Sequence, residues 1–357
     1  MRKIVCFTDS LGLGGAQRQL VGLATLLKNK GYDVTVLLYH NIPFYKQILD
    51  DCGIESVVIS GGYITRILRL YKYLRNCEID VIIAYQSMPS LIACLLRSFI
   101  DCKKLIVSER STSEKITFKK RILFRLWKYA DYIVPNSYSQ ESFIRNTVPQ
   151  YSDKLTVITN FIDTKVYVPK SSAPINENTL TLLTLARVTP IKNILEYIRA
   201  IHIVRQQGYE VSALWYGDTD CVEYQQQCHS LISKYNLSSS FIMRPAQNDV
   251  VSLYHAADVL CLPSLSEGCP NVICEAMGCG MPILCSDVCD NPRIVEDGEN
   301  AILFRTDCAE RIAEAIIQYI HLPLYKKQQM GIRSRELALL RFSSDVFIRK
   351  YINLIEN

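Results

Sequence analysis

Two glutamates, Glu267 and Glu275, stand with seven residues between them shortly after an apolar run, Val259–Leu262. The run is typical of a strand, and the residues after it predict a tight turn followed by a helix. A carboxylate in the turn and another inside the helix can each accept hydrogen bonds from the hydroxyl groups of a sugar or a ribose. The pattern therefore predicts a site for a ligand that carries both sugar hydroxyls and a diphosphate.

The start of this helix supplies the phosphate part of the prediction. Pro270 suits the first helical turn, because it has no amide hydrogen and its φ angle is preset. The backbone amides of Gly268, Cys269 and Asn271 are expected among the unpaired donors at the helix start, where the helix dipole favours an anion. The alternative interpretation is a surface helix whose glutamates only complement its dipole.

Two cations follow another predicted strand. The apolar run Leu180–Ala186 leads directly into Arg187, and Lys192 comes just before a predicted helix. An arginine fork and a lysine point charge at the mouth of a helix are suited to a diphosphate. Solvated loop charges are the alternative interpretation of this loop taken alone. The two glutamates at another strand end in the same half of the chain favour a shared site.

A glycine-rich loop follows the first predicted strand, Lys3–Phe7, and precedes a helix. Glycines at such a position, here Gly14 and Gly15, let backbone amides approach a phosphate closely. The loop departs from the G-x-G-x-x-G fingerprint, because Gln17 stands where the last glycine belongs, so a nicotinamide or flavin site is disfavoured. The alternative role of these glycines is a turn that requires positive φ angles.

The chain contains fourteen cysteines, scattered through the predicted strands and helices. We expect reduced thiols, because the chain is long and starts without a leader, unlike small disulfide-rich secreted domains. The densest group, between Cys261 and Cys289, has no C-x2-C pair, and the histidines do not cluster near it. No zinc site is therefore predicted, and cysteine serving as a small apolar side chain explains these positions.

Length and composition indicate a globular protein of two domains. The chain has 357 residues, of which 49% are hydrophobic, enough for substantial cores. The N-terminus runs straight into an apolar strand without the organisation of a signal peptide. The longest remaining apolar stretch, residues 90–100, is interrupted by Arg97 and is too short to span a bilayer. We therefore expect no membrane-spanning segment and a cytoplasmic protein.

Charge is divided unevenly along the chain. Residues 1–165 contain 23 Lys and Arg against 14 Asp and Glu, a net charge of +9, whereas residues 166–357 contain 17 against 21, a net charge of −4. A basic first half indicates a phosphate-rich partner, either nucleic acid or an anionic membrane surface. Nucleic acid is disfavoured, because no nucleic-acid-binding motif accompanies the charge.

Strand-like apolar runs alternate with helical stretches in both halves of the chain, which predicts α/β domains with parallel sheets. Residues 164–178 interrupt the alternation with polar residues and prolines, so we expect them to link two doubly wound domains. The expected domains are 1–165 and 166–341, with a C-terminal helix at 342–357 that packs back onto the first. Ligands are expected at the carboxyl ends of the strands, in the cleft between the domains.

Four features together resemble the retaining glycosyltransferases of family four, which have the GT-B fold. They are the glycine loop, the Arg187–Lys192 loop, the E-x7-E element and the two-domain length. The resemblance covers nearly the whole chain. It implies that Arg187 and Lys192 bind the diphosphate of a nucleotide-sugar donor, expected to be a UDP-sugar, and that Glu275 binds the ribose.

The resemblance also implies roles for other parts of the donor site. Glu267 and the amides of residues 268–271 would hold the sugar, and the Gly14–Gly15 loop would close over the phosphates from the other domain. Arg244 lies in a segment that resembles the loop next to the nucleotide base, where the backbone makes the contact.

The mechanism that the resemblance implies keeps the anomeric configuration without a protein nucleophile. The protein positions the two substrates and stabilises the charge on the departing diphosphate, so the catalytic candidates are Glu267, Arg187 and Lys192. Two cations and a helix start are available, and no D-x-D-type carboxylate cluster is evident. A cofactor and a divalent metal are therefore not expected.

The acceptor side departs from the family pattern. Many members carry a histidine at the end of the strand that here runs into Ser108-Glu109-Arg110, and Arg110 occupies that place. Glu109 and Arg110 either orient the acceptor or a phosphate, or form a structural ion pair. Gln17, after the glycine loop, is the third acceptor-side candidate.

Two basic amphipathic stretches, residues 66–75 and 119–129, mix cations with apolar and aromatic side chains. Such helices can rest on an anionic bilayer, although each also fits a helix that covers the sheet with its apolar face and solvates its charges. With the basic first half, they favour a peripheral enzyme at the cytoplasmic face of the membrane. The expected acceptor is a lipid-linked or other glycan of cell-surface polysaccharide synthesis. The alternative function is a non-catalytic GT-B-like scaffold or partner subunit.

Overall fold

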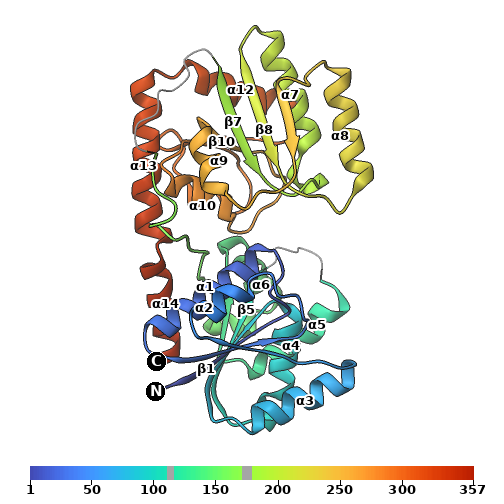
Figure 1. Ribbon diagram of the computed structural model, residues 1–357, viewed down its shortest axis with the longest axis vertical. Coiled ribbons are helices and arrows are strands. Elements are labelled where there is room, and N and C mark those ends of the chain that lie inside the picture. Colours follow the sequence, from blue (N-terminus) through green and yellow to red (C-terminus); the bar gives the residue numbers. More distant parts are fainter. Residues whose placement is uncertain (111–115, 171–178) are drawn as a thin grey trace. The chain divides into compact units, whose positions relative to one another are not determined.

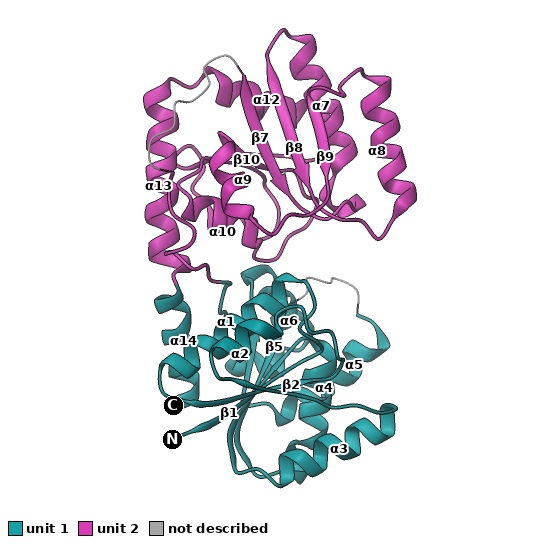
Figure 2. Cartoon of the chain, in the orientation of Figure 1, with its two compact units in different colours: residues 1–160, 344–357 teal, residues 161–343 magenta. Residues whose placement is uncertain are grey.

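The computed structural model describes residues 1–110, 116–170 and 179–357. Within these residues the chain divides into two compact units (Figure 2). Unit 1 consists of Met1–Asn160 and Ser344–Asn357, and unit 2 consists of Phe161–Ser343. Each unit is built around its own parallel sheet, as the alternation of strands and helices predicts.

Unit 1 contains a six-stranded sheet in the order β3-β2-β1-β4-β5-β6, and Figure 1 labels β1 and β5 in it. Its strands are β1 (Lys3–Thr8), β2 (Asp33–Leu38), β3 (Glu55–Val58), β4 (Ile79–Tyr85), β5 (Cys102–Glu109) and β6 (Tyr132–Pro135). Its helices are α1 (Gly15–Asn29), α2 (Lys46–Asp51), α3 (Tyr63–Arg75), α4 (Ser87–Leu96), α5 (Phe118–Leu126), α6 (Tyr138–Thr147) and α14 (Ser344–Glu356), with short 3-10 turns at Arg97–Phe99, Trp127–Tyr129 and Pro149–Lys154.

Unit 2 contains a six-stranded sheet in the order β12-β11-β10-β7-β8-β9. Its strands are β7 (Leu180–Leu185), β8 (Val211–Tyr216), β9 (Phe241–Arg244), β10 (Val259–Leu262), β11 (Ile283–Ser286) and β12 (Ala301–Phe304). Its helices are α7 (Ile194–Gln206), α8 (Val222–Lys234), α9 (Val250–Ala256), α10 (Asn271–Gly278), α11 (Asn291–Ile294), α12 (Ala309–His321) and α13 (Leu324–Phe342), with a 3-10 turn at Pro190–Lys192.

Continuous apolar runs place both sheets in the interior. All four residues of β10 are buried, as are the last five of β1, which is the pattern of strands covered by helices on both faces. In unit 1, β1 pairs in parallel with β2 and with β4, and in unit 2, β7 pairs in parallel with β8 and with β10. The strand order therefore reverses beside β1 and beside β7, and such switch points open a crevice at the carboxyl ends of the strands.

The chain passes between the units earlier than residues 164–178, the segment that the sequence favours as a linker. The amide of Ile162 donates to the carbonyl of Phe342 at 2.9 Å, inside unit 2. The guanidinium of Arg335 donates to the carbonyls of Thr164 and Tyr167 at 2.9 and 2.6 Å. These contacts hold residues 161–167 on unit 2, because Arg335 of α13 offers a partly buried donor to their backbone. Residues 171–178 lie outside the described part of the chain.

Helix α14 belongs to unit 1, although the sequence that precedes it belongs to unit 2. Tyr351 and Ile355 are buried, and the Arg2 side chain donates to the carbonyl of Ile355 at 2.5 Å. In the described residues, no helix is both long and apolar enough to cross a membrane.

None of the fourteen cysteines forms a disulfide. Burial raises the pKa of Cys6 and of Cys261 to about 12. These two thiols therefore remain protonated at neutral pH and serve as small apolar side chains in the cores.

Candidate functional site

The candidate donor site lies in unit 2, at the carboxyl ends of β7 and β10. These strands are neighbours in the sheet, with Val259 opposite Leu182 and Leu260 opposite Leu183. Their two loops are joined, because the Leu265 amide donates to the carbonyl of Ile191 at 2.8 Å. The reversal of strand order beside β7 therefore brings together the two loops in which the sequence predicts the charged residues.

Lys192 and Glu267 meet at this junction. The Nζ of Lys192 donates to Oε1 of Glu267 at 2.5 Å, and the two side chains are only 20% and 10% exposed. Lys192 ends a 3-10 turn, and Asn193 then adopts a left-handed conformation, φ 59°, from which α7 begins. The site therefore presents a largely buried ion pair, whose cation suits a diphosphate and whose carboxylate can accept a hydrogen bond from a sugar hydroxyl.

Glu275 lies on α10 and is 2% exposed. The hydroxyl of Tyr254, on α9, donates to its Oε2 at 2.9 Å. This hydrogen bond fixes the carboxylate in a defined orientation. The sequence did not single out Tyr254, because the bond joins two helices that are separated by a strand.

The start of α10 differs slightly from the expectation. Pro270 is the capping residue, with an extended ψ of 115°, and Asn271 is the first helical residue. Proline has no amide hydrogen, so it interrupts no helical bond in either position. Cys269 is buried, and its hydrogen bond with Cys274 is the main cause that raises the Cys274 pKa, with burial adding to it. Cys269 thus packs against the first turn of the helix.

Two basic candidates lie apart from this ion pair. Arg187 has a 71% exposed side chain, and its Nη1 lies 3.5 Å from a carboxylate oxygen of the still more exposed Asp220. Arg244 ends β9, and its side chain is exposed while its carbonyl accepts from the Gly217 amide at 3.0 Å. Both side chains belong to flexible types and extend from the same sheet edge, so they remain available to a ligand there.

Gly217, directly after β8, lies beside the candidate site and is not among the residues that the sequence predicts for it. A Cβ atom at this position would lie 1.9 Å from the carbonyl oxygen of Ala186, which precedes Arg187. That oxygen also accepts from Nε1 of Trp215 at 2.9 Å, so it cannot easily retreat. Only glycine lets the ends of β7 and β8 approach this closely. The one feature of the sequence that could have indicated this close approach is a single glycine directly after an apolar strand.

The glycine loop of unit 1 precedes α1. Gly14 caps the helix with an extended backbone, φ −177°, and Gly15 is its first residue. Neither has a positive φ angle, so the alternative of a turn that requires one is wrong for both. Gln17 lies in the first turn of α1, and a Cβ on Gly14 would lie 2.4 Å from its Oε1. The missing side chain thus leaves room for Gln17 beside the helix start.

Arg110 is held by contacts inside unit 1. Its Nη2 donates to the hydroxyls of Tyr85 and Tyr351 at 2.6 and 2.7 Å, and its Nη1 donates to Oδ1 of Asn160 at 3.2 Å. The guanidinium also lies 4.3 Å from the centre of the Tyr85 ring. Burial raises the pKa of Tyr85 well above its usual range, so its hydroxyl keeps its proton. Arg110 therefore connects Tyr85 of β4 with Tyr351 of α14. It also binds Asn160, the last residue of the first chain segment of unit 1.

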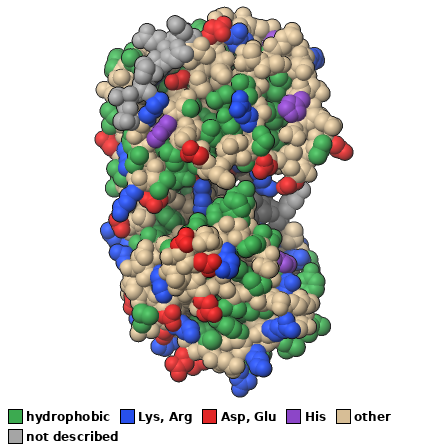
Figure 3. Space-filling view, viewed as in Figure 1, with side chains coloured by type: hydrophobic (Ala, Val, Ile, Leu, Met, Phe, Trp, Pro, Cys, Tyr) green, Lys and Arg blue, Asp and Glu red, His purple; other side chains and the backbone are tan. Residues whose placement is uncertain are grey.

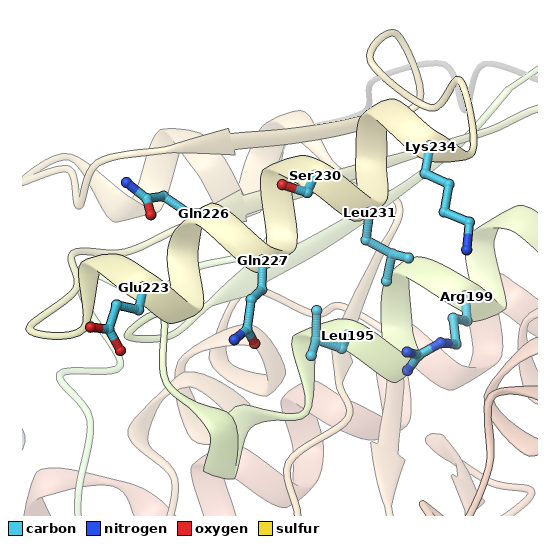
Figure 4. A pocket seen from close by; sticks show the side chains of 8 residues that line it. All are labelled: Leu195, Arg199, Glu223, Gln226, Gln227, Ser230, Leu231 and Lys234. Carbon is cyan, nitrogen blue, oxygen red and sulfur yellow. The ribbon is translucent and has the colours of Figure 1, made fainter.

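Glu109, the other candidate at the end of β5, is 3% exposed and accepts from Oγ of Ser87 at 3.3 Å. It lies at the carboxyl edge of the unit 1 sheet, as a residue that faces an acceptor would. A separate groove of about 670 Å³ runs between α7 and α8 (Figure 4) and is lined mainly by polar and charged side chains, including Arg199, Glu223 and Lys234. None of the site residues expected from the sequence lines it.

Known proteins resemble this chain over most of its length. Residues 13–166 match the family described as Glycosyltransferase Family 4, and residues 169–337 match Glycosyl transferases group 1. An uncharacterized glycosyltransferase of Haemophilus influenzae is 24% identical, covering 95% of this chain and 96% of the relative. The N-acetylgalactosamine-N,N'-diacetylbacillosaminyl-diphospho-undecaprenol 4-alpha-N-acetylgalactosaminyltransferase of Campylobacter jejuni is 25% identical, covering 86% and 87%.

A third relative is the UDP-Gal:alpha-D-GlcNAc-diphosphoundecaprenol alpha-1,3-galactosyltransferase of Escherichia coli, 21% identical and covering 86% of this chain and 84% of the relative. Among solved structures, HepE of Anabaena in complex with UDP superposes with a TM-score of 0.87 at 19% identity, covering 99% of both chains. The same protein with UDP-glucose has a TM-score of 0.86 at 20% identity, covering 100% of both. The two parallel α/β units thus have the GT-B fold.

Proposed function

Because this chain belongs to glycosyltransferase family 4, we propose that it moves a sugar from a UDP-sugar donor to a lipid-linked or other glycan acceptor with retention of configuration. The observation that carries the proposal is the junction of the loops after β7 and β10. It sets the half-buried Lys192–Glu267 pair and the oriented carboxylate of Glu275 at one switch point of the sheet. The named relatives and the UDP complexes of HepE support the choice of donor.

In this proposal the cations act on the diphosphate. When a phosphate binds, the ammonium group of Lys192 contacts it, either in place of Glu267 or in addition to it. Arg187, which pairs with exposed Asp220 at 3.5 Å, turns to bind the same phosphate. Both charges then stabilise the negative charge that builds up on the leaving diphosphate. The acceptor hydroxyl attacks on the face that the diphosphate leaves, and its proton passes to the departing phosphate oxygen.

The glutamates and the backbone orient the donor. Glu275 accepts hydrogen bonds from the ribose hydroxyls, and Glu267 with the Gly268–Asn271 segment holds the transferred sugar. The backbone at Arg244 contacts the base, and the amides of the Gly14–Gly15 loop bind a phosphate group. Positioning of this kind supplies much of the rate enhancement when no covalent intermediate is used.

Replacement of Arg187 by alanine tests the donor site. We expect UDP to raise the melting temperature of the wild type, since a ligand that binds the folded state stabilises it. The Arg187→Ala variant should bind UDP about tenfold more weakly, because a hydrogen bond to a charged group contributes about 1.5–3 kcal/mol. Isothermal titration with UDP measures the change, and UDP-sugars in a thermal-shift panel identify the donor.

Arg199→Ala is the matched control for this experiment. Arg199 is a partly exposed arginine of the same unit, paired with Glu196 on α7 and lining the groove away from the candidate site. It should bind UDP as the wild type does. Equal UDP affinity in Arg187→Ala and the wild type would contradict the assignment of Arg187 to the diphosphate.

We further propose that unit 1 docks on the cytoplasmic face of an anionic membrane, where a lipid-linked acceptor resides. Unit 1 holds 24 Lys and Arg against 15 Asp and Glu, and Figure 3 shows basic side chains together with hydrophobic ones on its visible face. Helix α3 leaves Tyr63, Ile64 and Leu68 at 77%, 76% and 59% exposure beside its basic residues. A helix that served only to cover the sheet would bury such side chains. Their exposure favours contact with lipid.

Replacing these three residues tests membrane docking. The wild type should float with vesicles that contain anionic phospholipid, and added salt should weaken the association, because the charges are screened. The combined change Tyr63→Ser, Ile64→Ser and Leu68→Ser should reduce the bound fraction several-fold, by about 0.8 kcal/mol per CH₂ that no longer enters the bilayer.

The control carries three comparable changes of exposed apolar residues on unit 2. Val222, Tyr325 and Ile332 are 61%, 64% and 62% exposed there, and replacing them by serine should leave flotation unchanged. A wild type that stays at the bottom of the gradient with anionic vesicles would contradict membrane docking while leaving the donor site untouched.

A non-catalytic role as a partner subunit remains the second candidate, and the position of Arg110 favours it. The residue that stands in place of the family histidine is committed to Tyr85, Tyr351 and Asn160. Donor turnover separates the two candidates. A protein that binds UDP-sugar, transfers it to no acceptor and stabilises a separate transferase would support the partner role.

A further inference from the structure

Gln86, between β4 and α4, has an unusual backbone conformation. Its φ is 73° and its ψ is 166°, a combination that is essentially restricted to glycine. Among the described residues with side chains, the other positive φ angles belong to two asparagines and one cysteine, and the two asparagines are at 59° and 54°. Asparagine tolerates the left-handed helical region, because its short side chain can hydrogen-bond to the nearby backbone. The longer side chain of glutamine offers no such local stabilisation of the conformation at Gln86. The strain therefore points to a role for its side chain.

The surrounding structure holds this strained turn in place. Tyr85, the preceding residue, is fully buried, and its hydroxyl is bound by Arg110 and lies 2.9 Å from the hydroxyl of Tyr351. The Gln86 amide donates to the carbonyl of Ser108 at 2.9 Å, and its carbonyl accepts from the Ser90 amide at 3.1 Å. Both backbone groups of Gln86 are thus committed, so the conformation is over-determined.

The side chain of Gln86 is also oriented. Its Oε1 accepts from Oγ1 of Thr8 at 3.3 Å, and Thr8, at the end of β1, is 1% exposed. Since the carbonyl oxygen of the amide is turned toward Thr8, Nε2 is turned away from it. Nε2 donates no hydrogen bond within the described parts of the chain, and the side chain is half-buried. Gln86 therefore presents two N–H groups to a ligand.

Ser87 supplies a complementary acceptor next to this donor. Its hydroxyl donates to the buried carboxylate of Glu109 at 3.3 Å, so its oxygen lone pairs remain for a ligand. Donation to a carboxylate also makes a hydroxyl a better acceptor, because hydrogen bonds in a chain polarise one another. A sugar hydroxyl both accepts and donates, so it matches Nε2 of Gln86 and Oγ of Ser87 together.

The position of Gln86 in the sheet agrees with a ligand site. Gln86 follows β4 and contacts the end of β1, and the strand order of the unit 1 sheet reverses between these two strands. The candidate donor residues occupy the equivalent place in unit 2, beside β7 and β10. Ligands of doubly wound sheets bind at this crevice.

We propose that Gln86 and Ser87 bind a hydroxyl group of the acceptor sugar, and that the backbone strain at Gln86 is retained because it fixes the direction of the side-chain amide at the switch point of the unit 1 sheet. This inference rests on the proposed function, since it names the acceptor subsite of that reaction. Glu109 acts behind Ser87, as a positioning residue.

Replacement by glycine separates strain from binding. Gln86→Gly removes the side chain and relieves the backbone, whereas Gln86→Ala removes the side chain and keeps the strain. We expect Gln86→Gly to melt at a higher temperature than Gln86→Ala. Both variants should raise the acceptor KM about five- to tenfold while UDP affinity stays at the wild-type value. The acceptor probe is alpha-D-GlcNAc-diphosphoundecaprenol, with the UDP-sugar identified by the thermal-shift panel.

Asn236→Gly is the matched control. Asn236 has φ 54° in the turn after α8, so the change also relieves a positive φ angle, but in unit 2. It should leave the acceptor KM unchanged. Ser87→Ala should raise the acceptor KM as the Gln86 variants do.

Two results would overturn the proposal. One is a Gln86→Gly variant that is more stable and keeps the wild-type acceptor KM, since the side chain would then serve no ligand. The other is a Gln86→Gly variant that melts below Gln86→Ala, since no strain would then exist.

A wild type that binds UDP but does not use this lipid is examined by saturation-transfer NMR with free N-acetylglucosamine and galactose. Signals that the wild type shows and Gln86→Ala loses would support the subsite. Equal signals in both, or none in the wild type, would overturn it. Failure of UDP binding itself would instead contradict the proposed function.

Discussion

Glu275→Gln is expected to lower UDP affinity by about a hundredfold or more while the fold persists. Each hydrogen bond to a charged group contributes about 1.5–3 kcal/mol, and the two ribose hydroxyls both depend on this carboxylate. Glutamine keeps the size of the side chain and an oxygen that accepts from Tyr254, so the contact at 2.9 Å survives in the folded protein. Isothermal titration with UDP and a thermal melt of the free protein measure the two effects.

Tyr254→Phe distinguishes a ligand contact from a structural one. It removes the hydroxyl that orients Glu275 but keeps the carboxylate and the ring, which is 1% exposed. We expect a moderate loss of UDP affinity, about tenfold, because the carboxylate remains charged but loses its fixed orientation. If Glu275→Gln bound UDP as tightly as the wild type, Glu275 would have only a structural role.

Gly217→Ala is expected to destabilise unit 2 strongly for the addition of a single methyl group. Its Cβ would lie 1.9 Å from the carbonyl oxygen and 2.6 Å from the carbonyl carbon of Ala186, both backbone atoms. Overpacking costs about 1–3 kcal/mol even where side chains can shift, and here the main chain must move. At about 2–4 °C per kcal/mol, the melting temperature should fall by several degrees. UDP affinity should fall as well, because the displaced segment leads directly into Arg187.

Gly62→Ala is the control for Gly217→Ala. Gly62 precedes α3 with φ −71°, and a Cβ there would meet nothing within 4 Å. Its melting temperature should change little. An unchanged melting temperature and UDP affinity in Gly217→Ala would show that β7 and β8 can separate without cost, contrary to the packing described above.

The fold was largely predictable because its signals are local. Apolar runs of strand length alternate with amphipathic helices, and a parallel sheet covered by helices is the arrangement that buries both. Charged residues placed just after those runs had to lie at one edge of a sheet, since parallel strands end together. The sequence therefore predicts that Lys192 and Glu267 lie close together, and Nζ of Lys192 lies 2.5 Å from Oε1 of Glu267. That they bind a donor remains a prediction.

Contacts between distant segments were less predictable. Arg110 looked like a substitute for a family histidine, yet its partner Tyr351 lies 241 residues further along the chain. The chain passes from unit 1 to unit 2 after Asn160, and this position likewise depends on hydrogen bonds between residues 161–167 and α13. No short window of sequence contains both members of such pairs, so periodicity and motif spacing cannot predict these contacts.

The sequence by itself determined the two α/β units and the strand ends that carry the donor candidates, because strand and helix periodicity and the loops that follow depend on neighbouring residues only. The tertiary structure alone decided which side chains are paired, buried or strained. It placed Tyr254 on Glu275, set Gly217 against Ala186 and held Gln86 in a conformation that glutamine does not choose. Those features depend on how the strand order reverses within each sheet, because this reversal brings distant loops together. The reversal cannot be predicted from any single segment of the sequence.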